Sequence, residues 1–219
     1  MTGKDSSRAR VLAVVKSLLS FAAKSGRTQF NVGAALRKPK SREMLSERIL
    51  DESAVIRMVA LAQGRDHALV RLMYASGFRV SEAVSLRWVD VAAANDGSAF
   101  LTVFGKGGKT RTVRVSAATA GVLRELRGDA RDDDFVFPGR KGHLDTSQAW
   151  RIVRKAAQAA KIDRPVSPHF LRHAHASHAL DKGVKLTTVR DTLGHSSIAT
   201  TNRYAHARPD ESSGLSLAV

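Results

Sequence analysis

The stretch SAFLTVF-GKGGK-TRTVRVS, residues 98–116, decides the fold class of this chain. Two runs rich in β-branched and aromatic residues alternate with polar ones, and a basic, glycine-rich segment separates them. This pattern is typical of two antiparallel strands joined by a turn, so we expect a hairpin over residues 98–115. The short run Trp88–Val91 before it is a candidate third strand.

Segments with helical spacing surround this hairpin. Residues 8–24 carry a broad apolar face that stops before Gly26. Gly77 ends the apolar helix that is expected over residues 66–75, and Ser81 is the expected cap of the helix that follows. Further helices are expected from about Asp51 and over residues 66–75, 81–87, 116–127, 146–161, 168–182 and 185–193, with an exposed loop over 132–142. The predicted fold class is mainly α with a small antiparallel β-sheet (α+β).

Charge and composition restrict the classes of function. The 219 residues include 36 Lys+Arg and 20 Asp+Glu, a net charge of +16. Such a charge favours a polyanionic partner, nucleic acid above all, over a charge that serves solubility alone. The chain has no cysteine, which excludes disulfides and thiolate sites within it and fits a reducing cytoplasm. No apolar run approaches the ~20 residues that cross a bilayer, and no secretory signal is recognised, so we expect a cytoplasmic protein without membrane contact.

Four short segments hold polar residues that core packing does not require: GFRVSE (77–82), GKGGK (105–109), HFLRH (169–173) and LGHSSIATTNRYAH (193–206). A nucleic acid, the partner that the net charge favours, carries anionic phosphodiesters. Arginine suits that charge because its planar fork donates two hydrogen bonds and stays protonated. Arg79 and Arg172 are therefore candidate phosphate ligands. The alternative for Arg79 is a surface ion pair with Glu82.

Taken together and in this order, the four segments resemble the signature motifs of the tyrosine recombinases, also called phage integrases, and of the Xer-type resolvases among them. The resemblance covers roughly residues 46–206. It implies the catalytic fold of DNA breaking–rejoining enzymes and site-specific cleavage and rejoining of double-stranded DNA through a 3′-phosphotyrosyl intermediate. It also implies that no metal or ATP is needed, and that the protein works as a homo-oligomer, a tetramer on DNA, or with a partner recombinase.

The resemblance assigns the nucleophile and the general acid. Tyr204 is the expected nucleophile, and a phenol, which titrates near ~10, needs cations or a base nearby to attack phosphorus at neutral pH. Lys106, at the hairpin turn, is the expected acid for the leaving 5′-hydroxyl. Lys109 is a competing candidate in the same turn.

The remaining polar residues are expected to surround the phosphate. The resemblance makes His169 a hydrogen-bond partner of the phosphate and a candidate proton acceptor, and His195 a second hydrogen-bond donor. Glu82 is expected to support Arg79. Weaker contacts with the DNA backbone are expected from Lys109, Arg111, Arg140, Lys141 and Arg203.

Two metal-dependent alternatives use the same residues. His173 and His175, followed by Tyr204, mimic the His-hydrophobic-His motif of rolling-circle nickases, and His169 with His173 at i, i+4 could bind zinc. Residues 168–182 are expected to form a helix, on which positions i and i+2 diverge, and Arg172 would lie between the zinc ligands. We therefore expect no metal site.

The order of the segments predicts two parts. Residues 1–45 resemble a remnant of the family's helical core-binding domain with its linker, and residues 46–219 resemble the catalytic domain. The apolar face of residues 11–22 would then pack on the catalytic domain, self-associate, or mark a truncated product. Two other functions stay open: a catalytically idle DNA-binding remnant and a type IB topoisomerase-like relaxing activity.

Overall fold

A computed structural model describes residues 2–37, 45–105, 108, 110–140 and 142–205. Internal contacts divide the chain into two units, Met1–Met44 and Leu45–Val219. Three of the expected site residues, Lys106, Lys109 and Lys141, lie outside the described residues. Among the described helices, none combines the length and the apolar character that crossing a membrane requires.

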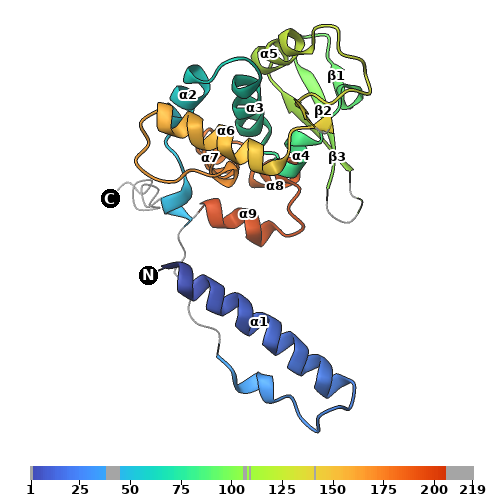
Figure 1. The fold of residues 1–219 in the computed structure, drawn as a ribbon, viewed down its shortest axis with the longest axis vertical. Helices are drawn as coiled ribbons and strands as arrows, with labels where there is room; N and C mark the ends of the chain where they lie inside the picture. The colour runs from blue at the N-terminus through green and yellow to red at the C-terminus, as the bar shows by residue number, and fades with distance from the viewer. Residues whose placement is uncertain (1, 38–44, 106–107, 109, 141, 206–219) are drawn as a thin grey trace, which may run out of the picture. The chain divides into compact units, whose positions relative to one another are not determined.

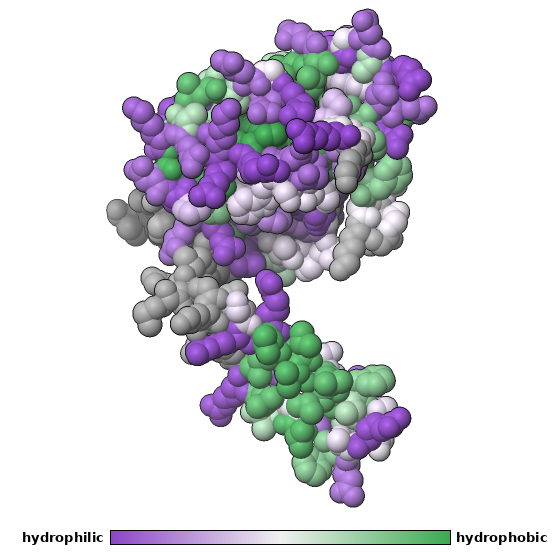
Figure 2. Space-filling view, in the orientation of Figure 1, coloured by the Kyte–Doolittle hydropathy of each residue, from purple (hydrophilic) through white to green (hydrophobic). Residues whose placement is uncertain are grey.

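The first unit pairs a long helix with a short one. The helix expected over residues 8–24 begins earlier, as α1 (Thr2–Lys24). A short 3₁₀ helix, η1 (Val32–Ala35), packs against it; η denotes a 3₁₀ helix throughout. Asn31 fixes η1, because its Oδ1 accepts from the Gly33 backbone N–H at 3.1 Å. Figure 2 shows apolar side chains gathered on one face of this unit. Those exposed by 63–69% are Val11, Val14, Leu18, Phe21 and Phe30.

The second unit is mostly helical with a small antiparallel sheet, which confirms the predicted fold class (Figure 1). Its helices are η2 (Ser46–Arg48), α2 (Glu52–Leu61), α3 (Gly64–Ser76), α4 (Val80–Val84), η3 (Trp88–Asp90), α5 (Ala117–Arg127), α6 (Thr146–Ala159), α7 (Pro168–Asp181), α8 (Leu186–Leu193) and α9 (Ile198–Ala205). Its strands are β1 (Val91–Ala93), β2 (Ala99–Phe104), β3 (Thr110–Val115), β4 (Pro138–Gly139) and β5 (Gly142–His143).

The predicted hairpin is present as β2 and β3. They pair antiparallel with Ala99 opposite Val115 and Phe104 opposite Thr110. The third strand, β1, pairs with β2 but covers residues 91–93, because the expected run from Trp88 first forms η3. Alternate residues of β2 are buried, which fixes one face of the sheet against the helices.

Helix α3 lies at the centre of the helical core. It packs against α2, α5, α6 and α7 and reaches β3, and its inward residues are almost fully buried. The helix ends at Gly77, whose left-handed backbone (φ +62°) lets the chain turn where a side chain has no room. A Cβ there would lie 2.7 Å from Leu193 Cδ2 and 2.8 Å from His175 Cδ2. The end of α3 is therefore held directly against α7 and α8.

Two local expectations were wrong. Ser81 does not cap α4; the helix begins at Val80 with Arg79 as its N-cap, because the Glu82 carboxylate accepts the Arg79 backbone N–H. Residues 132–135 and 138–142, which were expected to mark an exposed loop, lead into the short β4–β5 pair, in which Pro138 is opposite His143.

One helix, α9, had no counterpart in the sequence prediction. Its residues include Thr200, Thr201 and Asn202, which are poor helix formers. Thr201 and Tyr204 are buried, and α9 packs on α7 and α8. Tertiary contacts therefore stabilise a segment that local propensity alone does not predict.

Gly77→Ala should destabilise the second unit by about 2 to 5 kcal/mol, since it adds a steric clash to the strain of a left-handed alanine. Gly183→Ala is the matched control, because Gly183 has φ +79° but no atom within 4 Å of an added Cβ. It should cost only about 1 to 2 kcal/mol. Urea unfolding of both variants measures the difference, and equal losses would contradict the close packing of Gly77.

Candidate active site

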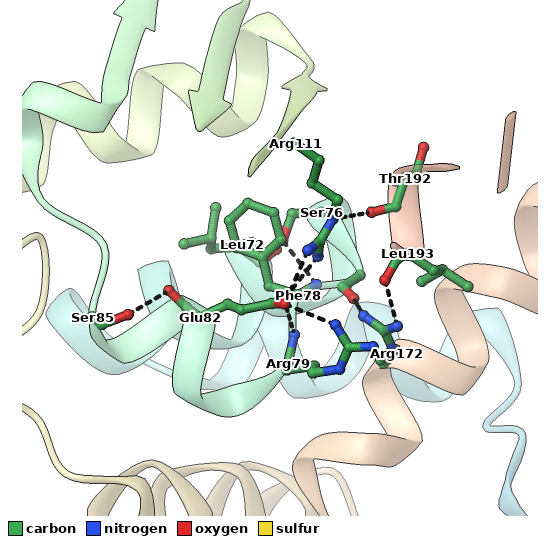
Figure 3. A network of polar contacts seen from close by, with 11 residues as sticks. Leu72, Ser76, Phe78, Arg79, Glu82, Ser85, Arg111, Arg172, Thr192 and Leu193 are labelled. Carbon is green, nitrogen blue, oxygen red and sulfur yellow. Dashed lines mark hydrogen bonds and ion pairs between the residues drawn. The ribbon is translucent and has the colours of Figure 1, made fainter. Parts of the chain in front are cut away.

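A single buried carboxylate organises the polar network in Figure 3. Glu82, which is 6% exposed, accepts hydrogen bonds from Nη1 and Nη2 of Arg111 at 2.9 and 2.8 Å. The same carboxylate accepts from Arg79 Nη1 at 2.9 Å and from the Arg79 backbone N–H at 2.8 Å. Burial by itself would raise the pKa of Glu82, but the hydrogen bonds from Arg111 and Arg79 outweigh it and lower the pKa to about 2. Glu82 is thus an anion at neutral pH that holds both guanidinium groups.

Arg111 connects the sheet to two helices, and its expected contact with the DNA backbone stays a prediction. Its side chain is only 13% exposed, and besides the bidentate pair with Glu82 its Nε donates to the Thr192 carbonyl at 2.8 Å. A Cβ on Gly194 would lie 3.0 Å from Arg111 Nη1, so the turn after α8 closes tightly over the guanidinium. Through these three hydrogen bonds Arg111 joins β3 to α4 and α8.

Arg172 connects the ends of two helices. Arg172 is only 5% exposed. Its side chain donates from Nη1 to the Gly77 carbonyl and from Nη2 to the Leu193 carbonyl, both at 2.6 Å (Figure 3). Carbonyls at helix C-termini lack intrahelical partners and carry partial negative charge, so they suit a cation. Burial, and then the charge of Arg79, lower the pKa of Arg172 to about 10, which leaves it protonated at neutral pH.

Tyr204 lies on α9 with its ring largely buried. The residue is 6% exposed and belongs to a small apolar cluster with Ala176, Val189 and Leu193. Its hydroxyl lies 2.8 Å from His173 Nδ1. Burial raises the pKa of Tyr204, and the charges of Arg172 and Arg203 oppose that effect only in part. The phenol therefore keeps its proton at neutral pH.

The histidines His195 and His169 lie close to the arginines. His195 follows Gly194, its Nδ1 is 2.9 Å from Thr201 Oγ1, and its ring is nearly parallel to that of Tyr204 with centroids 6.4 Å apart. Burial, and then the charges of Arg172 and Arg79, lower the pKa of His195 to about 4. The same causes, in the same order, lower the pKa of His169 on α7. Both rings are hydrogen-bonding groups without charge at neutral pH.

The structure brings most of the expected residues to one place. Arg172 influences the pKa of His169, His195 and Tyr204, and Arg79 influences that of both histidines, so these groups share one electrostatic environment. Glu82 contacts Arg79, as expected. Arg140 and Arg203 have exposed side chains, and their DNA contacts stay predictions.

Sequence reasoning considered His173 only as a metal ligand and gave it no role beside Tyr204, although a signal for one was present. His169, Arg172 and His173 stand at i, i+3 and i+4 on one helix, so they share a face. The His-hydrophobic-His pattern does not converge on that helix: His173 faces Tyr204, whereas His175 Nδ1 is 2.8 Å from the Tyr74 carbonyl on α3.

Comparisons with known proteins identify the family of this chain. Residues 47–211 match the model of the phage integrase family. Tyrosine recombinase XerC of Xanthomonas axonopodis pv. citri (strain 306) is 38% identical over 205 residues, which cover 90% of this chain and 66% of that relative. The crystal structure of XerA recombinase superposes with a TM-score of 0.66 at 28% identity, covering 85% of this chain and 68% of that one.

A more distant structure shares the fold. A lambda integrase tetramer bound to a Holliday junction has a TM-score of 0.74 at 19% identity, covering 96% of this chain and 62% of that one. The chain spans 66% of the length of its XerC relative. On its motifs, its fold and its match over residues 47–211, the chain belongs to the phage integrase family, with Xer recombinases among its relatives.

Proposed function

We propose that this chain cleaves and rejoins double-stranded DNA at specific sites through a 3′-phosphotyrosyl bond to Tyr204, without metal or ATP. One observation carries the proposal. The buried Tyr204, the buried Arg172, the Arg79 that Glu82 anchors and the neutral His195 share one electrostatic environment. Membership of the family, with recombinases among the relatives, supports it.

The two arginines supply fixed positive charge for a phosphate. Arg79 is anchored on Glu82 through Nη1 and keeps 37% of its side chain exposed, so it can reach an incoming phosphate. Arg172 is held by two carbonyls and loses little freedom when a phosphate binds. Charges that are already in place stabilise the charge that develops on the non-bridging oxygens without reorganisation during the reaction.

The histidines and the tyrosine complete the reaction. His195 and His169 would donate hydrogen bonds to the phosphate as neutral rings. Tyr204 Oη would bond to phosphorus and give its proton to a neighbouring neutral histidine as the bond to the 5′-oxygen breaks, and Lys106 would give that oxygen a proton. The product is still a phosphodiester, so attack by a 5′-hydroxyl would reverse the step without an energy source.

The partners follow from charge and from the family's structures. The net charge of +16 suits a DNA duplex. Neighbours in fold were solved as a lambda integrase dimer on a core site and a tetramer on a Holliday junction, which supports binding to DNA as a homo-oligomer, four protomers at the complete junction or a mixed assembly with a partner recombinase. We place this activity in the cytoplasm.

A nicked suicide duplex tests the chemistry directly. Because the nick lets the short 5′-product diffuse away, the wild-type chain should accumulate a covalent DNA adduct on a pool of duplexes with a randomised core, even in EDTA. Tyr204→Phe should abolish the adduct while DNA affinity changes by less than about threefold, since the hydroxyl acts only in the chemical step. Denaturing gels and sequencing of the trapped DNA give the readout.

Four outcomes would count against this proposal. An adduct that survives Tyr204→Phe would exclude this nucleophile, and one that requires a divalent ion would favour a nickase. DNA binding without any adduct across the pool would favour the idle remnant. Relaxation of a supercoiled plasmid without strand exchange between duplexes would favour the topoisomerase-like activity.

Arg79→Ala should lower the rate of adduct formation by about 10²- to 10³-fold, because it removes a donor aimed at charge in the transition state. Arg114→Ala is the matched control. It removes the same charge from an exposed arginine on β3 that pairs with Asp96. Both variants should bind DNA with similar small losses, measured by gel shift at fixed salt. Equal rate losses in the two variants would contradict a specific role for Arg79.

A further inference from the structure

The tyrosine hydroxyl has a defined hydrogen-bond partner. His173 Nδ1 lies 2.8 Å from Tyr204 Oη, and the two ring centroids are 5.6 Å apart. His173 stands on α7 directly after Arg172, so the helix that supplies a guanidinium also supplies this imidazole. Within the described part of the chain, no hydrogen bond joins His169 to Tyr204, although the rings of His169 and His173 lie only 6.4 Å apart.

Both members of this pair are neutral before reaction. Burial raises the pKa of Tyr204, so the phenol retains its proton. Burial, and then His169 and the arginines nearby, lower the pKa of His173 to about 4, so the imidazole keeps a free lone pair at neutral pH. In the tautomer that carries its proton on Nε2, the Nδ1 of His173 is unprotonated and accepts from the Tyr204 hydroxyl at hydrogen-bond distance, which is the arrangement that proton transfer requires.

The surroundings of His173 are basic and open to solvent. The charged and titratable groups that act on it are His169 and Arg172 of α7, Arg48 of η2 and Arg203 of α9. A phosphate anion entering beside these cations offsets their charge and raises the basicity of the imidazole. His173 also lines an open pocket of about 590 Å³ with Arg48, Trp150 and Ser167, among others, which gives the ring water with which to exchange protons.

We propose that His173, rather than His169, is the proton acceptor for the Tyr204 nucleophile. As the Oη–P bond forms, the Oη–H bond breaks and its proton moves to Nδ1. The P–O5′ bond breaks at the same phosphorus, and the 5′-oxygen takes a proton from the general acid. In the reverse step the His173 imidazolium returns its proton to the departing phenolate. This assignment rests on the proposed function of the site.

Substrates with a sulfur in place of the bridging 5′-oxygen separate the two proton transfers. A thiolate, with a thiol pKa near ~8.5, leaves without help from an acid. Loss of the general acid is therefore rescued by this substrate, whereas loss of the proton acceptor for Tyr204 is not. Single-turnover adduct formation on oxygen- and sulfur-bridged suicide duplexes from pH 6 to 9 gives the readout, with thermal unfolding as the check on folding.

His173→Asn is the informative variant, because its amide reaches the position of Nδ1 and can hydrogen bond with Tyr204 but cannot take the proton. Its rate at pH 7 should fall by about 10²- to 10⁴-fold on both substrates. It should rise about tenfold per pH unit as the phenolate fraction grows, whereas the wild-type rate stays nearly flat. His169→Asn is the matched control one turn away, and it should slow the reaction without this slope.

Several results would overturn the assignment. His173→Asn with a wild-type rate, a flat pH profile or rescue by the sulfur-bridged duplex would each show that His173 takes no proton from Tyr204. The steep slope appearing in His169→Asn instead would return the role to His169. Should His173→Asn unfold, His173→Ala gives the pH slope and the comparison of the two substrates, because it removes the proton acceptor together with its hydrogen bond. Absence of any adduct from the wild-type chain would instead refute the proposed function itself.

Discussion

The buried carboxylate of Glu82 is the constraint on which the rest of the site depends. Three guanidinium groups, of Arg79, Arg111 and Arg172, gather around one carboxylate, so the cluster remains positive after Glu82 has neutralised part of the charge. Without this anion the arginines would repel one another in a poorly solvated place. With it, Arg79 is held in one orientation, and the cluster keeps a net positive charge that favours the binding of a phosphate.

The ends of two helices extend this network to the nucleophile. Arg172 binds the last carbonyls of α3 and α8, and Arg111 binds the carbonyl before the latter. The turn that follows α8 carries His195, and α9 then carries Tyr204. Gly77 and Gly194 make this possible, because each adopts a left-handed backbone where a side chain would meet its neighbours. The positions of charge and nucleophile are therefore set by shared contacts between α3, α4, β3, α7 and α8.

The sequence predicted features that have a local cause and missed those that arise from tertiary packing. The β2–β3 hairpin followed from alternation around a glycine-rich turn, and the end of α3 followed from Gly77. Helix α9 was missed because Thr200, Thr201 and Asn202 disfavour helix, and burial against α7 and α8 overrides that preference. Arg111 was expected to face DNA, because nothing in the sequence of its strand indicates that Glu82 and the Thr192 carbonyl of α8 accept its hydrogen bonds. His173 was considered only as a metal ligand, and its contact with Tyr204 was missed, although its helical spacing from His169 placed it on the same face.

Tyr204, Arg79, Arg172 and His195 are proposed to act on one phosphorus atom. A structure of this chain with a nicked duplex and orthovanadate, which mimics the five-coordinate transition state, would show whether they do. We expect vanadium bonded to Tyr204 Oη, with both guanidinium groups and the His195 ring donating to its equatorial oxygens. Vanadate bound away from Tyr204, or bound there with Arg79 and Arg172 outside hydrogen-bond distance, would show that these groups do not form one active site.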